Sequence, residues 1–82
     1  MTNLEILAEI LGDLLGVTES EVTLESTMEA MGGDSLDDVE FIMALEEEYD
    51  IEIPDDDAEE LKTVGDVLNL LERYEAVSKK NG

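Results

Sequence analysis

Residues 32–50 read GGDSLDDVEFIMALEEEYD, and this stretch decides the fold because its apolar residues recur at the spacing of an α-helix. The pattern predicts a helix over Ser35–Tyr49, which Asp34 or Ser35 opens as a cap after the two glycines. At about 100° per residue, one face of this helix gathers side chains suited to a core. They are Phe41, Ile42, Leu45 and Tyr49.

A second apolar face lies on the opposite side of the same helix and alternates with carboxylates. Its apolar residues are Leu36, Val39 and Met43, and the carboxylates between them are Glu40 and Glu47. An exposed apolar stripe rimmed by charge is typical of a docking surface. Isolated apolar residues are also common on protein surfaces, so the pattern alone leaves both interpretations open.

The rest of the chain predicts three more helices. The first should cover Asn3–Leu15, with Thr2 as its cap. A short helix over Asp55–Leu61 and a last helix from Thr63 to about Val77 follow. The sequence therefore predicts an all-α fold, a four-helix bundle with a long first loop and a short third helix, in a single domain over residues 1–82.

Two segments lie outside these helices. The connection over residues 17–33 is long for a compact domain, and connections of this length are more often functional than idle. We expect four apolar side chains to pin it to the core: Val22, Leu24, Met28 and Met31. We expect the tail over residues 78–82 to be disordered.

The charge of the chain is large and one-sided. Twenty-four acids face four bases, and fourteen of the acids lie between Asp34 and Glu60 with no base among them. We expect no nucleic-acid partner, because phosphate binding requires Lys and Arg. An anionic membrane surface would also repel the chain. Basic proteins are the natural partners, and opposite charge would steer their encounter.

The absence of two residue types narrows the function. Without cysteine or histidine, the chain lacks thiolates, the commonest general base and the commonest nitrogen ligand of metals. We therefore expect no catalytic residues, no metal site and no enzyme activity. No apolar run reaches the ~20 residues of a membrane span, and the start of the chain lacks a signal-peptide pattern. This predicts no membrane insertion and a cytoplasmic location.

Ser35 lies where the glycine pair ends and the predicted helix begins. Serine is a preferred cap, so a purely structural role is the simplest interpretation. The N–H groups and the dipole at a helix N-terminus also favour a phosphate, which makes Ser35 a suitable attachment point for a phosphodiester. The residue types alone leave both roles open.

The segment Gly33-Asp34-Ser35-Leu36-Asp37 resembles the modification motif of the acyl carrier proteins. Residues 39–50 resemble the second helix of that family, and residues 53–64 resemble its third helix and the start of its fourth. Leu15-Gly16-Val17 matches the end of the first helix. The ordered set covers nearly the whole chain, about Leu4 to Leu71, so the sequence is identified as resembling a discrete acyl carrier protein.

The resemblance implies that Ser35 accepts 4′-phosphopantetheine from coenzyme A, transferred by a separate Mg²⁺-dependent phosphopantetheinyl transferase. The thiol of this group would hold acyl intermediates as thioesters for enzymes of fatty-acid or lipid biosynthesis. These partners would be acyl-processing enzymes with basic faces, such as ketoacyl synthases, reductases, dehydratases and acyltransferases. The chain itself would be a monomeric carrier.

The same resemblance assigns roles to further residues. Motif and partner recognition would use Asp34, Leu36, Asp37, Val39, Glu40, Met43, Glu46 and Glu47. The acyl chain would enter the bundle between the second and third helices. Candidates for lining this pocket are Ile42, Leu45, Ile53, Ala58, Leu61 and Val64. The alternative is an ordinary core without a usable cavity.

Some residues depart from the pattern of fatty-acid carriers. Met28 and Met31 stand where many of them have an aromatic residue and a leucine, and Gly32-Gly33 replaces the frequent Gly-Ala. These differences leave open a specialised carrier for polyketide, peptidyl or lipid A acyl groups. An acidic cation-binding protein is a rival of another class, but residues 55–57 lack the alternation and the glycine of an EF-hand loop.

Overall fold

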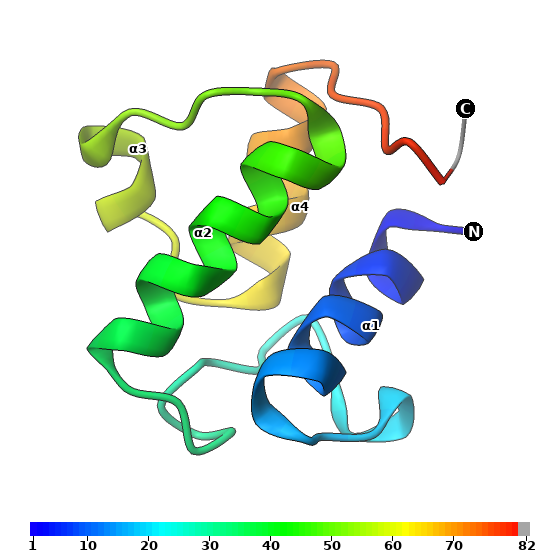
Figure 1. The fold of residues 1–82 in the computed structure, drawn as a ribbon, viewed down its shortest axis with the longest axis vertical. Helices are drawn as coiled ribbons and strands as arrows, with labels where there is room; N and C mark the ends of the chain where they lie inside the picture. Colours follow the sequence, from blue (N-terminus) through cyan, green and yellow to red (C-terminus); the bar gives the residue numbers. More distant parts are fainter. Residues whose placement is uncertain (81–82) are drawn as a thin grey trace.

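The computed structural model describes residues 1–80, which form four α-helices and one turn of 3₁₀-helix (Figure 1). The elements are α1 (Asn3–Leu15), η1 (Glu19–Glu21), α2 (Ser35–Tyr49), α3 (Asp55–Glu59) and α4 (Val64–Arg73). Over the described residues the only β pairing is an isolated bridge between Thr27 and Thr63. The predicted all-α architecture, with its long first loop and short third helix, is confirmed.

Each of the three longer helices begins with a capping box. In each box a side chain at the cap accepts from a backbone N–H three residues later, and that later side chain accepts in return from the N–H of the cap. The pairs are Thr2 with Glu5, Asp34 with Asp37, and Thr63 with Asp66. Because the signal is local, the starts of α1 and α2 fall where the sequence predicts them.

The core joins α1, α2 and α4. Ile6, Leu7 and Leu11 of α1 are fully buried, as are Leu45 of α2 and Leu70 of α4. Helix α1 packs against both α2 and α4. By contrast, α3 contributes no buried residue, so it packs at the edge of the core.

The long loop is held to the core differently from the prediction. Val22 is buried and both methionines of the loop pack half-buried against the core, but Leu24 is 52% exposed. The backbone of Leu24 holds the loop instead, because its carbonyl accepts a hydrogen bond from Gly65 N at 2.9 Å. A Cβ on Gly65 would lie 3.1 Å from that oxygen, so this close approach of two backbones depends on glycine.

The last third of the chain departs from the prediction in its boundaries. Helix α3 ends at Glu59, two residues early, and α4 ends at Arg73 instead of Val77. Glu75 adopts a left-handed conformation with φ of 50°, which a continuing helix cannot accommodate.

The tail also differs from the prediction of disorder. Ser78 is only 1% exposed, and its Oγ donates to Glu48 Oε2 at 2.6 Å. The segment from Ser78 to Lys80 is therefore anchored by hydrogen bonds to α2, whereas residues 81 and 82 lie outside the described residues.

Candidate functional site

Ser35 is the first residue of α2 and its side chain is exposed. The helix is capped by its neighbour, since Asp37 N donates to Asp34 Oδ1 at 3.1 Å and Asp34 N donates to Asp37 Oδ2 at 3.0 Å. The structure thus gives the capping role to Asp34. The Ser35 hydroxyl lies outside the capping interaction and faces solvent.

The two glycines before the motif shape its approach to α2. Gly32 has a φ of 88°, in the region that favours glycine. Gly33 N donates to Met28 O at 2.7 Å, and a Cβ on Gly33 would lie 3.1 Å from that same oxygen. The missing side chain of Gly33, two residues before α2 begins, lets the loop pack directly on the backbone of Met28.

The apolar stripe predicted on α2 is exposed. Leu36, Val39 and Met43 are 65%, 56% and 61% exposed, so three large apolar side chains of one helix are in contact with solvent. Phe41, Leu45 and Tyr49 cover the opposite, buried face. Helix α2 therefore has two apolar faces, as the sequence predicts, and only one of them belongs to the core.

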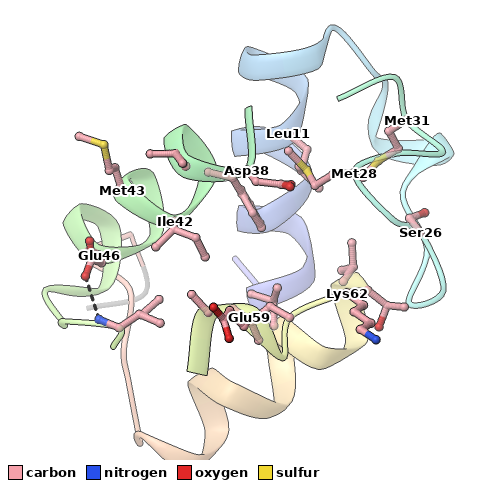
Figure 2. A pocket seen from close by; sticks show the side chains of 18 of the residues that line it. Leu11, Ser26, Met28, Met31, Asp38, Ile42, Met43, Glu46, Glu59 and Lys62 are labelled. Carbon is pink, nitrogen blue, oxygen red and sulfur yellow. Dashed lines mark hydrogen bonds between the residues drawn. The ribbon is translucent and has the colours of Figure 1, made fainter. Parts of the chain in front are cut away.

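The carboxylates beside this stripe differ in their surroundings. Asp34, Glu40 and Glu47 are exposed. Glu46 is half-buried, and its Oε2 accepts a hydrogen bond from Ile53 N at 2.8 Å, drawn as a dashed line in Figure 2. This charge-assisted bond ties the loop between α2 and α3 back onto α2. Glu46 therefore has a structural partner that the sequence pattern does not reveal.

A cleft of about 620 Å³ opens between α2, α3 and the long loop (Figure 2). Five of the six predicted pocket residues line it: Ile42, Ile53, Ala58, Leu61 and Val64. The sixth, Leu45, is fully buried and is not part of the lining, because it lies on the side of α2 that packs into the core.

Several lining residues are absent from the sequence prediction. Met28 and Met31 reach the cleft from the long loop, and Phe41 and Val67 do so from α2 and α4. Val39 and Met43 line its edge as well, so the exposed stripe and the cleft adjoin. Periodicity within one helix could not show these residues, since loop and helix meet only in the folded chain.

The cleft begins on the face of α2 that carries Ser35. Seven residues separate Ser35 from Ile42, which is about 20° short of two full turns, so their side chains leave the helix in nearly the same direction. The rise between them is about 10 Å. Asp38 and Glu46, which also line the cleft, lie on this face. A group attached to Ser35 therefore starts in line with the cleft.

The described residues 1–80 contain no group of three or more acidic side chains arranged to hold a metal ion. No helix in this part of the chain is long and apolar enough to cross a bilayer.

Comparisons with known proteins agree on one family. Residues 5–71 match the family model described as a phosphopantetheine attachment site. An acyl carrier protein of Clostridium perfringens is 56% identical over 69 residues, which cover 83% of this chain and 91% of the relative. An acyl carrier protein of Clostridium acetobutylicum is 48% identical over 71 residues, covering 85% and 92%.

The match to a phosphopantetheine attachment site over residues 5–71 defines the class: a protein that carries a covalently bound group. The chain belongs to the acyl carrier proteins, and its cofactor is 4′-phosphopantetheine.

The start of α2 fits this cofactor. A phosphodiester on Ser35 would lie beside the N–H groups of Ser35 and Leu36, which come before the first hydrogen bond within the helix and lie outside the capping box. The phosphodiester would also be repelled by the negative charges of Asp34, Asp37 and Asp38. The carboxylates of Asp34 and Asp37 are partly compensated, because each accepts a hydrogen bond from a backbone N–H group in the capping box. The exposure of Ser35 leaves its hydroxyl accessible to a modifying enzyme.

Proposed function

We propose that Ser35 is the residue that carries 4′-phosphopantetheine in this carrier. The observation that supports this assignment is the capping of α2 by Asp34, which leaves the Ser35 hydroxyl exposed at the helix start and aligned with the cleft. When bound, the group supplies a thiol that holds acyl groups as thioesters. The chain's own residues position the attachment point, recognise partners and shelter the cargo.

The cleft between α2 and α3 shelters the acyl chain. Ile42, Ile53 and Ala58 offer apolar contacts along it, and each methylene withdrawn from water contributes about 0.8 kcal/mol. Met28 and Met31 can adapt to chains of different shape because methionine is unbranched and flexible. The acyl group is thereby protected while it travels between enzymes.

The exposed face of α2 docks those enzymes. Leu36, Val39 and Met43 supply the apolar contact, and the exposed Glu40 and Glu47 attract Lys and Arg on the partner. The phosphopantetheinyl transferase and basic-faced synthases, reductases, dehydratases and acyltransferases are the partners of this face. We place the carrier in the cytoplasm as a monomer that serves fatty-acid or lipid biosynthesis, with a specialised polyketide, peptidyl or lipid A pathway as the alternative.

Modification by coenzyme A tests the assignment. The apo protein is incubated with coenzyme A, Mg²⁺ and a phosphopantetheinyl transferase, and intact mass and peptide spectrometry locate the added group. We expect one addition, at Ser35, and none in Ser35→Ala. Addition at Ser20, Ser26 or Ser78, or no addition, would show the assignment to be wrong.

Loading with acyl chains of increasing length tests the cleft. The melting temperature should rise with each added methylene while the chain fits, and it should stop rising once the cleft is full. Ala58→Leu places extra atoms in the cleft, so the melting temperature of this variant should stop rising at a shorter acyl chain. A melting temperature independent of chain length would show that the acyl group stays in solvent.

Charge reversal tests the docking face. Glu40→Lys and Glu47→Lys should each weaken binding to the transferase at low salt, and the difference should shrink at 0.5 M NaCl, roughly, as exposed charges are screened. Glu72→Lys makes the same change of charge on the exposed part of α4 and is the control. Equal weakening by all three variants would point to total charge and not to a docking face.

A further inference from the structure

The segment that follows α4 folds back across the C-terminal half of α2 and onto α1. Besides the bond from Ser78 Oγ to Glu48 Oε2 at 2.6 Å, Lys79 N donates to the backbone carbonyl of Glu48 at 3.1 Å. Lys80 Nζ lies 2.5 Å from Glu9 Oε1 and 4.0 Å from Glu48 Oε1. In Figure 1 this segment, drawn in red, runs back toward the N-terminal end of α1.

This contact lies outside the part of the chain that defines the family. The family model matches residues 5–71, whereas the folded-back segment is Ser78–Lys80. It also carries two of the four basic residues of a chain with 24 acids. The segment therefore brings scarce positive charge to one particular acidic face.

Glu47 connects this face to the docking face. It is exposed beside the stripe of α2, and it also lines a small cleft of about 260 Å³ together with Glu48, Lys79 and Lys80. Asp13 of α1 belongs to the same cleft. The hydrogen bond to Glu9 raises the pKa of Lys80 by more than desolvation lowers it, and the charges of the nearby carboxylates raise it further, so this lysine stays charged there. A basic partner that reaches Glu47 meets lysines that are already in place.

We propose that Ser78–Lys80 acts as an intramolecular competitor of basic partners at the C-terminal half of α2. The surface freely available for docking is then the N-terminal half of α2, around Asp34, Leu36 and Glu40. Partners confined to that half bind without hindrance, and partners that extend to Glu47 must displace the lysines. The inference rests on the proposed function, in which basic enzymes dock on α2.

The cost of displacing Lys80 from its ion pair sets the size of the effect. The ion pair of Lys80 with Glu9 joins side chains that are 35% and 46% exposed, and solvent screens exposed pairs of this kind, so they contribute only weakly. Removal of the lysine should therefore strengthen binding of a partner that uses Glu47 by about two- to fivefold. The gain should be lost when salt screens the pair.

The test measures KM of the apo carrier as a substrate of the phosphopantetheinyl transferase, at low and high salt, for three variants. Lys80→Gln removes the paired charge. Arg73→Gln is the matched control, because it removes one positive charge from the exposed last turn of α4. Ser78→Ala removes the partly buried hydrogen bond to Glu48 without changing the charge. Circular dichroism checks that each variant keeps the helical fold.

We expect Lys80→Gln and Ser78→Ala to lower KM about two- to fivefold at low salt and Arg73→Gln to change it by less. Equal effects of Lys80→Gln and Arg73→Gln would show that only total charge matters and would overturn the proposal. An unchanged KM in both tail variants, for a transferase whose binding Glu47→Lys weakens, would overturn it too. If the transferase modifies no variant at Ser35, the proposed function fails instead, so the two failures are distinguishable.

Discussion

Asp50 ends α2 in a left-handed conformation, with φ of 52° and ψ of 51°. This position carries two unfavourable features at once. A side chain in the left-handed region costs about 1 kcal/mol or more, although Asp tolerates it better than most residues. A negative charge beside the C-terminus of a helix is also unfavourable, by about 0.3–1 kcal/mol. We predict that replacing Asp50 stabilises the protein.

Two substitutions separate these contributions. Asp50→Asn keeps the tolerance for the left-handed region and removes only the charge, so it should stabilise by about 0.3–1 kcal/mol. Asp50→Gly also relieves the backbone, a gain of about 1 kcal/mol that is partly offset by about 0.4–1 kcal/mol of extra entropy in the unfolded chain. In a domain of this size, 1 kcal/mol corresponds to a rise in melting temperature of about 4–8 °C.

Thermal unfolding followed by circular dichroism at low and high salt measures both effects. The gain from Asp50→Asn should fade with salt because it is electrostatic, and the additional gain from Asp50→Gly should persist because it is conformational. Asp38→Asn, in the first turn of the same helix, is the control and should not stabilise through the helix dipole. A melting temperature lowered by Asp50→Gly would refute the reasoning.

Three further predictions follow from the hydrogen bonds and packing described above. The hydrogen bond from the N–H of Thr63 holds the pKa of Asp66 below its ordinary value. The stability that this capping box adds is therefore present above about pH 4 and is lost as the pH falls through the lowered pKa. In thermal unfolding between pH 6 and pH 3, roughly, the melting temperature of Asp66→Asn should depend less on pH than that of the unchanged protein. Burial raises the pKa of Tyr49 to about 12. The protonated side chain therefore stabilises the fold fully below pH 10, roughly, and this stabilisation is lost as the pH rises toward 12. The absorbance of tyrosinate should show this late titration, and Tyr49→Phe should remove it. Gly65→Ala should lower the midpoint of urea unfolding, because the new Cβ would press on the Leu24 carbonyl. The gain in helix propensity, about 1 kcal/mol, offsets part of this cost, and an unchanged or raised midpoint would mean that the loop moves away.

The features that the sequence predicts correctly are those with local causes. The starts of α1 and α2 follow from capping residues three positions apart, and the two faces of α2 follow from its helical period. Leu24 shows the limit of this reasoning. Its apolar side chain suggests burial, yet the loop is held by its carbonyl, through Gly65 some forty residues further along the chain.

The candidate site also has features with local causes, which the sequence predicts, and features that depend on contacts between distant segments, which it does not. The position of Ser35 at the helix start is a local feature, and so is the exposure of Leu36 and Met43. The partner of Glu46, the burial of Ser78 and the methionines of the cleft depend on contacts between distant segments. No spacing within one helix encodes such contacts, because they arise when the loop, α3 and the tail pack on α2.

The capping of α2 by Asp34 has a consequence for how a carrier can be used repeatedly. The hydrogen bonds that begin the helix involve Asp34 and Asp37, so a group joined to the Ser35 oxygen breaks none of them. Attachment and removal therefore exert no direct pull on the first turn of α2. The same folded molecule can therefore gain or lose the whole group without rebuilding the start of its longest helix.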